Sequence, residues 1–379
     1  MGRASAGESS IFRDQEGRWH GYVSAGHGPD GRRDRRHVSA KTRAEVVSKV
    51  RALERQRESG NLATAGRIPT VAQWLEHWVE SIASQRVSAR TLDSYRDTAR
   101  LQLTPALGHH RLDRLQPEHI ETLYARLSQE GRAPSSVLRT HRILSRALKV
   151  AVQRGRVGRN VCALVDAPSA RRTEVEPLST PEARAVLAAA AERRNSARWS
   201  VALALGLRQG EALGLRWQDL DLESATLTVR QALQRLRGRG LVFVPPKSAA
   251  GRRTIALPAP LVQALRDHRR QQLLERVAAG SEWRNAGLVF AQPNGSPIDP
   301  KADYTAWRRL LTAAGVRSAR LHDARHTAAT LLLQQGVPAR VAMQILGHSQ
   351  ITLTLGTYTH VLPEVGKEAA DRITSALWP

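Results

Sequence analysis

The sequence predicts a multidomain fold in which a small α+β module, an all-α bundle and a mainly α-helical domain follow one another. Three observations support this prediction. The chain has 379 residues, 41% of them hydrophobic, and is long enough to bury several separate cores. Apolar residues recur at helical spacing along most of it. Alternation of apolar and polar residues marks only residues 10–40 and a short stretch of the last domain.

The front of the chain predicts a three-stranded antiparallel sheet followed by one helix. Residues 10–40 alternate apolar with polar residues around two turn sequences, DQEG and GPDG. The following KTRAEVVSKVRALERQRESG has helical spacing and stops at Gly60. A module this small is marginally stable alone, and its strands are basic. We therefore expect residues 1–66 to form a domain that contacts something large.

Residues 67–165 predict an all-α domain of four helices. VAQWLEHWVESIAS opens it with a single apolar stripe, and Pro117 suits the first turn of the third helix. The last helix, within SSVLRTHRILSRALKVAVQRG, carries a basic face that we expect to meet phosphate. That face consists of Arg139, His141, Arg142, Arg146 and Lys149.

The loop RNVCALVDAPSARRTEVEPLS separates this bundle from a last domain, which we place at residues 178–379. Helical patterns dominate the domain and end in a tail helix, PEVGKEAADRITSALWP, whose apolar residues need another surface to cover them. Three short stretches, at 225–233, 240–246 and 252–258, have strand character. They predict a small three-stranded antiparallel sheet.

The charge of the chain indicates a polyanionic partner. Lys and Arg total 58 against 34 Asp and Glu, a net charge of +24. Only six of the basic residues are lysines, and the planar fork of arginine suits two-pronged contacts with phosphate. A GC-rich genome could explain the ratio of Arg to Lys, but it does not explain the net charge.

The composition also argues against several classes of protein. No run of eighteen apolar residues occurs, and the N-terminus lacks the apolar core of a secretory signal, so we expect no membrane association and a cytoplasmic location. A single cysteine, Cys162, excludes an internal disulfide framework and a cysteine-based metal cluster.

Two cations of the last domain stand where a plain core would not want them. Arg208 directly follows an apolar helix in ALALGLRQGEALGLRWQDLDL. It either pairs with Glu211 or Asp219 or projects into a cleft. Lys247 lies in the turn between two predicted strands in VPPKSAAGRRTIAL, a position where a lysine is usually solvated.

Three further groups lie nearer the C-terminus. His322 and Arg325 are one turn apart at the start of a helix in LHDARHTAATLLLQQG, a spacing that suits a phosphate. His348 follows the helix-ending Gly347, and Tyr358 comes ten residues later in ITLTLGTYTH. Either could be an ordinary surface residue when considered alone.

Together these groups are typical of phosphoryl transfer without a metal ion. Arginines neutralise phosphate oxygens, histidines shuttle protons, a lysine protonates a leaving oxygen and a tyrosine forms a covalent intermediate. The chain shows no carboxylate cluster with metal-ligand spacing, so no metal or cofactor is expected. A free phenol has a pKa of about 10, so only on the order of one in a thousand is ionised at neutral pH and the cations must stabilise its charge.

The order GLRQGE, an interstrand lysine, HDARH, LGHS and TYTH strongly resembles the tyrosine recombinases, or phage-type integrases. The resemblance covers the whole chain. It implies an arm-type DNA-binding module at 1–66, a SAM-like core-binding domain at 67–165 and a catalytic domain at 178–379.

The resemblance also implies a role for each motif residue. Tyr358 would attack a scissile DNA phosphate and keep the 3′-phosphate, and Lys247 would protonate the leaving 5′-oxygen. The remaining catalytic groups would be the phosphate-binding Arg208 and Arg325 and the histidines His322 and His348, with Glu211 in support.

Several positions depart from the family pattern. Leu205, Ala324 and Ala328 replace residues that are usually Thr, Leu and Phe, and all three are packing changes beside intact polar groups. Gly356 costs about 1 kcal/mol relative to Ala inside a helix. It could let the tyrosine segment bend. His360 is expected to pack or to contact DNA rather than to take part in the chemistry.

The resemblance implies a recombinase that integrates and excises a mobile element such as a phage or an integrative plasmid. Its partners would be double-stranded DNA with core-type and arm-type sites, three further copies of itself in a tetramer, an excisionase and a DNA-bending host factor. Two alternatives stay open from the residues alone. One is a nicking and closing enzyme like type IB topoisomerases, and the other is a DNA-binding regulator whose active site has decayed.

Overall fold

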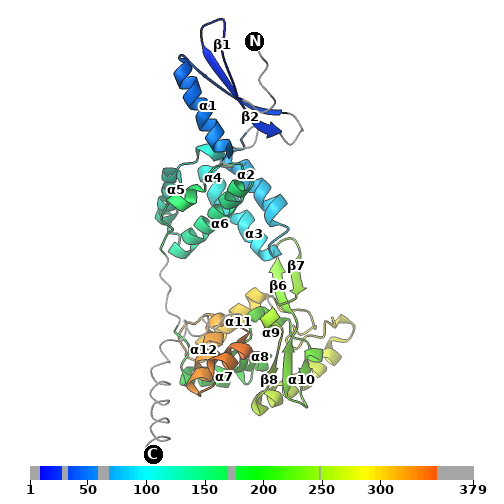
Figure 1. Cartoon of the computed structure of the whole chain (residues 1–379). Coiled ribbons are helices and arrows are strands. Elements are labelled where there is room, and N and C mark those ends of the chain that lie inside the picture. Colours follow the sequence, from blue (N-terminus) through cyan, green and yellow to red (C-terminus); the bar gives the residue numbers. More distant parts are fainter. Residues whose placement is uncertain (1–8, 28–32, 59–67, 170–175, 247–248, 348–379) are drawn as a thin grey trace, which may run out of the picture. The chain divides into compact units, whose positions relative to one another are not determined.

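The computed structural model is mainly α-helical with small antiparallel sheets, as the sequence predicts (Figure 1). It forms two compact units, Met1–Arg172 and Thr173–Pro379, and each is described separately. In the part that the structure describes, no helix is long and apolar enough to cross a lipid bilayer. The described residues are 9–27, 33–58, 68–169, 176–246 and 249–347.

The front module is a three-stranded antiparallel sheet covered by one helix, as predicted. The strands pair in the order β1-β2-β3, and Val23 and Ala40 of the sheet pack against Val46 and Val50 of the helix. Gly21 allows this close approach, because a Cβ there would lie 2.5 Å from the Val50 side chain. The elements are β1 (Ser10–Arg13), β2 (Trp19–His27), β3 (Arg33–Ala40) and α1 (Arg43–Glu58).

Four helical segments follow between residues 68 and 169, as the apolar periodicity predicts. Pro117 and Pro134 begin two of them, where a missing N–H costs nothing. The first two segments each contain a π-helical stretch, Trp78–Ala83 and Ala99–Leu103. The α-helices are α2 (Val71–His77), α3 (Ala89–Thr98), α4 (Thr104–Leu107), α5 (Pro117–Gln129) and α6 (Pro134–Gln153).

Helix α8 is the central helix of the second unit. Its residues Val201 and Leu205 belong to one buried cluster, shared with the small sheet and α10, while Trp199 and Leu203 belong to another, shared with α7 and α11. Apolar residues on two faces of α8 therefore place this helix between two cores. The helices of this unit are α7 (Thr180–Ala190), α8 (Ser196–Leu205), α9 (Gln209–Leu213), α10 (Ala259–Ala279), α11 (Pro300–Ala313), α12 (Leu321–Gln334) and α13 (Ala339–Leu346).

The three-stranded sheet of the second unit exists, but its strands differ from those predicted. The predicted strand 225–233 is divided between two sheets, and 240–246 pairs outside the three-stranded one. The sheet order is β4-β5-β8, and β6 and β7 form a separate two-stranded hairpin. The strands are β4 (Leu220–Asp221), β5 (Thr226–Val229), β6 (Ala232–Leu236), β7 (Gly240–Val244) and β8 (Arg253–Ala256).

Side chains explain where the predicted strand divides. Between β5 and β6, Arg230 Nε lies 3.4 Å from the Asp219 carboxylate, and the Gln231 amide donates to the Gly214 carbonyl at 2.9 Å. The chain then turns back at once through Gly238, which has a φ of 69°. A tight glycine turn favours pairing between neighbours in sequence, so β7 pairs with β6 rather than with β8.

Candidate active site

Arg208 lies at a sharp change of chain direction between α8 and α9. Helix α8 ends at Leu205, and Gly206 takes a left-handed conformation with a φ of 60°. Helix α9 begins one residue after Arg208. The Arg208 side chain is 42% exposed, so the turn presents a guanidinium at the edge of the buried core.

Glu211 forms an ion pair with Arg208, and the alternative partner Asp219 does not. Arg208 Nη1 donates to Glu211 Oε1 at 2.7 Å, and the Arg208 backbone N–H donates to Oε2 at 3.1 Å. Asp219 instead accepts two hydrogen bonds from the Arg216 guanidinium, at 3.0 and 3.2 Å. Of the two carboxylates that the sequence offered as partners, Glu211 is the one observed.

A second arginine, Arg253, shares Glu211 and was missed by sequence reasoning. Its Nη2 donates to Glu211 Oε2 at 3.0 Å, and both side chains are nearly buried. Burial raises the pKa of Glu211, but Arg253 and then Arg208 outweigh it and hold that pKa below its usual value. The available signal was the second arginine of GRRTIAL, a charged residue at the start of an alternating strand.

Arg325 projects from α12 toward the turn that carries Arg208. Its guanidinium is almost fully buried, and Nη1 donates to the Gly206 carbonyl at 2.8 Å. Glycine at position 206 allows α12 and α13 to pack this close to the turn, since a Cβ there would lie 2.7 Å from Leu346 Cδ2 and 3.1 Å from Ala328 Cβ. The fold therefore brings together Arg208 and Arg325, which are far apart in sequence.

His322 lies one turn before Arg325 on the same helix. Loss of water around the ring and, after it, the neighbouring His326, Arg325 and Arg208 together lower its pKa to about 4, and Asp323 opposes them. Part of the side chain is nevertheless exposed to solvent. His322 is therefore a neutral imidazole at neutral pH in the protein without ligand.

A buried ion pair also supports the turn. Gln209 donates its amide to Asp303 Oδ2 at 3.0 Å and to the Pro300 carbonyl at 2.7 Å. Asp303 in turn accepts two hydrogen bonds from Arg198, at 3.2 and 3.0 Å, and both charged side chains are almost fully buried. The residue after Arg208 is thus fixed to α8 and α11.

The C-terminal end of helix α13 contacts Arg208. Gly347 has a φ of 67°, and its carbonyl accepts a hydrogen bond of 3.0 Å from Arg208 Nη2. Three predicted site residues, Lys247, His348 and Tyr358, lie outside the described residues, as do Gly356 and His360.

The described part of the site can bind an anion and exchange protons. It offers the exposed Arg208 guanidinium beside Arg325 and a neutral imidazole at His322. Within the described ranges, no group of three or more His, Cys, Asp or Glu has the geometry to hold a metal ion. A phosphate group matches this set of donors.

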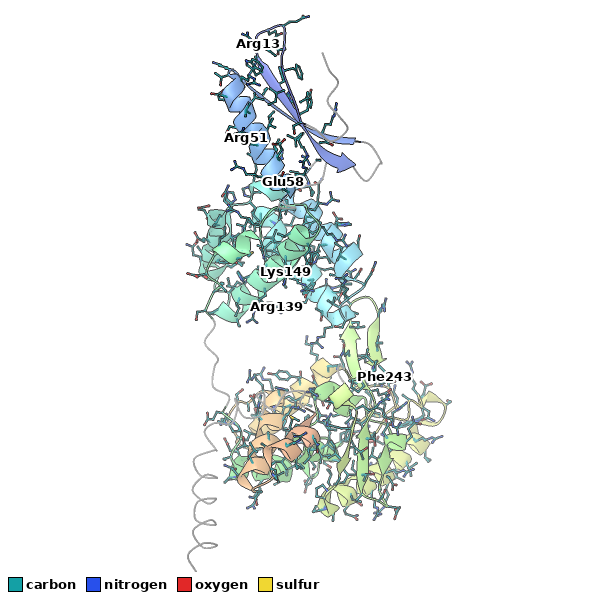
Figure 2. The ribbon with its side chains drawn as sticks, in the orientation of Figure 1. Arg13, Arg51, Glu58, Arg139, Lys149 and Phe243 are labelled. Atoms are coloured by element: carbon teal, nitrogen blue, oxygen red, sulfur yellow. The ribbon has the colours of Figure 1, made fainter. Side chains whose placement is uncertain are left out.

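The predicted basic face of α6 is largely present. Arg139, Arg142, Arg146 and Lys149 are exposed and recur every three or four residues, and Figure 2 labels the first and last of them. His141 does not belong to this face, because its Nδ1 is 2.6 Å from the hydroxyl of the largely buried Tyr124. Desolvation and the nearby Arg142 lower the pKa of His141.

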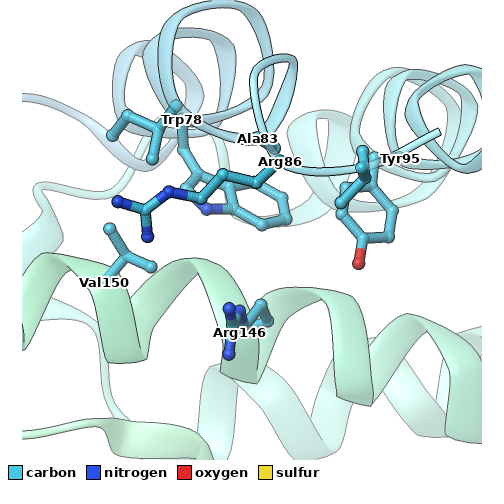
Figure 3. Close-up of a pocket in the computed structure, with 8 residues that line it drawn as sticks. Trp78, Ala83, Arg86, Tyr95, Arg146 and Val150 are labelled. Carbon is cyan, nitrogen blue, oxygen red and sulfur yellow. The ribbon is translucent and has the colours of Figure 1, made fainter. Parts of the chain in front are cut away.

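One residue of this face also lines a pocket of about 350 Å³ (Figure 3). Trp78 and Tyr95 stack at a ring separation of 5.1 Å in its wall, and Val150 adds an apolar side. The guanidinium groups of Arg86 and Arg146 are the charged groups of its lining.

Comparison with known proteins identifies clear relatives. The model of the phage integrase family matches residues 177–364, and that of the phage integrase N-terminal SAM-like domain matches residues 70–128. The chain is similar to a protein named integrase from Saccharopolyspora erythraea. The two are 41% identical over an alignment of 425 positions, gaps included, which covers 98% of this chain and 97% of the relative.

Two solved structures share the fold. One is the Tn1549 transposon integrase in complex with transposon right end DNA, with a TM-score of 0.70 and 21% identity, covering 80% of this chain and 99% of that one. The other is a lambda integrase tetramer bound to a Holliday junction, with a TM-score of 0.56 and 18% identity, covering 90% of this chain and 96% of that one.

Proposed function

This chain belongs to the phage integrase family of tyrosine recombinases, and we propose that the site around Arg208 and Arg325 binds the scissile phosphate of a DNA strand. The protein is a site-specific recombinase that breaks and rejoins DNA strands.

The proposed nucleophile is Tyr358. Its hydroxyl oxygen attacks the scissile phosphorus, a bond forms between tyrosine and phosphate, and the bond to the 5′-oxygen breaks. Lys247 gives the leaving 5′-oxygen a proton, and a neighbouring imidazole takes the proton of the tyrosine. The 5′-hydroxyl of another strand reverses these steps and joins the strands without ATP, because the phosphotyrosyl bond retains the energy of the phosphodiester.

The other proposed catalytic groups stabilise the charge on the phosphate. Arg208 and Arg325 bind its non-bridging oxygens, and His322 and His348 donate hydrogen bonds or exchange protons with them. A neutral His322 suits this role, since a bound phosphate would favour the protonated ring and make the imidazole a proton acceptor. Glu211 supports Arg208 and does not touch the phosphate.

The observation that carries the proposal is the convergence of Arg208 and Arg325 at one turn. The two residues come from separate helices, and Arg325 donates to the Gly206 carbonyl just before Arg208. The charges of both arginines also lower the pKa of His322, so the imidazole belongs to the same cluster. Two guanidinium groups and an imidazole at one turn suit the oxygens of a phosphate group.

The rest of the chain has proposed roles in holding DNA. Residues 1–66 bind arm-type sites, residues 67–165 bind core-type sites with the basic face of α6, and residues 178–379 carry out catalysis. Four copies assemble on DNA, as in the lambda integrase tetramer bound to a Holliday junction. We further assign an excisionase and a DNA-bending host factor as partners. The DNA belongs to a phage or an integrative plasmid, so the protein acts in the bacterial cytoplasm.

Trapping on a nicked suicide duplex tests this proposal. The core sequence comes from the direct repeats that flank the element in its genome. We expect the wild-type protein to form a covalent adduct on the 3′ side of the break, and Tyr358→Phe to form none while still binding the duplex. Arg208→Gln and Arg325→Gln should bind the duplex and cleave it at least 100-fold more slowly, the range for loss of one transition-state donor, about 10²–10³. Adduct formation by Tyr358→Phe would refute the nucleophile.

A further inference from the structure

We propose that Arg253 is a positioning residue for the strand-cleavage reaction, one that holds Glu211 against Arg208 and binds the end of helix α13 beside them. The inference rests on the proposed function, because it concerns how the same site is assembled. Arg253 has no catalytic role in this proposal. It acts through Arg208 and through the segment that leads to His348.

The first contact of Arg253 is with the carboxylate that supports Arg208. Glu211 Oε1 accepts from Arg208 Nη1 at 2.7 Å, and Oε2 accepts from Arg253 Nη2 at 3.0 Å. The side chains of Glu211 and Arg253 are only 5% and 7% exposed. One carboxylate thus serves two arginines, and the buried arginine fixes the orientation in which the carboxylate meets the exposed one.

The second contact is with the C-terminal end of α13. Arg253 Nε donates to the Ile345 carbonyl at 2.6 Å. Two residues later, the Gly347 carbonyl accepts from Arg208 Nη2 at 3.0 Å. A Cβ at position 347 would lie 2.7 Å from Arg253 Nη1, so glycine is required for the chain to pass this close. Both arginines therefore bind the last described residues at the end of α13, and His348 is the next residue in the sequence.

Arg253 also reaches back along its own strand. Its Nη1 donates to the Gly251 carbonyl at 3.2 Å, just before β8 begins. Lys247 lies six residues before Arg253. The single side chain therefore joins three pieces of chain, namely the residues that lead into β8, the end of α13 and, through Glu211, the turn that carries Arg208.

The contacts require an arginine in particular. The three nitrogens of the guanidinium point in three fixed directions and meet Ile345, Gly251 and Glu211 separately. A lysine would keep the charge but could not make all three contacts from one nitrogen. Arg253→Lys should therefore keep the ion pair with Glu211 and lose the connection to α13.

Charge gives the proposal a distinctive readout. Burial disfavours the ionised form of Glu211, and the charges that oppose it among the described residues are Arg253 on β8 and Arg208 at the start of α9. With Arg253 removed, the pKa of Glu211 rises. Protonated Glu211 binds Arg208 less strongly, so cleavage should decline at a higher pH than in the wild type.

The test measures adduct formation on the suicide duplex from about pH 4 to about pH 8, a range that spans the ordinary pKa values of Glu, about 4.3, and His, about 6.5. We expect Arg253→Met to bind the duplex normally, to cleave it about 100-fold more slowly, as a misplacement of about 1 Å can do, and to shift the acid limb of the rate profile upward. Arg253→Lys should recover the acid limb and only part of the rate. In a Glu211→Gln background, Arg253→Met should no longer shift the acid limb.

Arg266→Met is the matched control. It removes the same charge as Arg253→Met, but from a surface pair that Arg266 forms with the exposed Glu223. It should leave the rate and the acid limb unchanged. The inference is overturned if Arg253→Met cleaves at the wild-type rate, or if its slower cleavage keeps the wild-type pH profile. It fails separately from the proposed function, which fails if the wild type forms no adduct through Tyr358.

Discussion

Gly206 links the two proposed phosphate-binding arginines, because it lies two residues before Arg208 and accepts a hydrogen bond from Arg325. Its φ of 60° lies in the left-handed region, where residues other than glycine have a strained backbone. A Cβ there would also lie 2.7 Å from Leu346 Cδ2 and 3.1 Å from Ala328 Cβ. The position therefore combines backbone strain with close packing, and its carbonyl is the acceptor for Arg325.

We predict that Gly206→Ala is more destabilising than the same change at Gly336. Gly336 has a φ of 73° and open space around its missing Cβ, so Gly336→Ala should cost only the left-handed strain, about 1–2 kcal/mol. Gly206→Ala should cost a further 1–3 kcal/mol or so from overpacking. Urea unfolding of the two variants gives the comparison, and equal losses would show that the packing at Gly206 yields freely.

His322 should make the stability of the protein depend on pH. Its pKa is about 4 in the folded protein, against an ordinary value of about 6.5 in the unfolded chain. Between these values the unfolded state binds the proton and the folded state does not. Stability therefore falls as the pH is lowered from about 6.5 to about 4.

Replacing this histidine should remove its part of the pH dependence. We expect His322→Gln to lose less stability than the wild type when the pH falls from about 6.5 to about 4, because glutamine takes up no proton. His326, whose pKa is also lowered, remains in both proteins, so some acid sensitivity persists. Melting temperatures of both proteins across this range provide the measurement. Parallel curves would mean that the His322 ring is as well hydrated in the folded as in the unfolded protein.

Helices α8 and α11 are joined by the buried pair of Arg198 and Asp303. The pair also anchors Gln209, so the same contact supports the core and the turn that carries Arg208. Charges this deep are stable only as a pair. The position of α8 and α11 beside the proposed site thus depends on this buried polar contact.

We predict that Asp303→Ala costs about 3–5 kcal/mol of stability, because it leaves the Arg198 charge buried without its partner. Glu223→Ala, which breaks the exposed pair with Arg266, should cost about 0–1 kcal/mol. The double change Arg198→Met and Asp303→Leu should recover most of the loss, since it removes both charges. Urea denaturation distinguishes these outcomes, and a loss for Asp303→Ala as small as for Glu223→Ala would argue against the pair.

Across the whole molecule, the excess positive charge of +24 should make DNA binding strongly dependent on salt. The logarithm of the binding constant falls as the logarithm of the salt concentration rises, by about 0.9 for each phosphate that is neutralised. We predict that Arg142→Gln with Arg146→Gln makes this slope less steep by about 1.8, because two phosphates are no longer neutralised. Arg142→Lys with Arg146→Lys keeps the charge and should keep the slope. An unchanged slope in the glutamine variant would show that the basic face of α6 does not meet phosphate.

Much of the architecture was predictable from local pattern. Helical periodicity predicts the four helical segments of the bundle and most helices of the second unit, and Pro117 was correctly expected in the first turn of its helix. Strand character at 225–233 was recognised, but its division between two sheets was not. An apolar alternation shows that a segment is a strand and does not say which partner it pairs with.

The proposed site shows the same limit at the level of side chains. The link between Arg208 and Glu211 could be expected, because Arg208 directly precedes a short helix and Glu211 follows it by three positions. His141 was placed on the basic face of α6, whereas its ring contacts the Tyr124 hydroxyl. Its neighbours along the helix gave no sign of a partner on α5.

The identity, order and charge of the motif residues are properties of the sequence, and they were sufficient to indicate a recombinase that acts on DNA. The contacts among those residues depend on packing. Arg253 reaches Glu211 across 42 positions, and Arg208 reaches the Gly347 carbonyl across 139. Local preferences extend over a few residues, whereas these contacts exist only once the cores on both sides of α8 have formed and brought the turn, the strand and the helix end together.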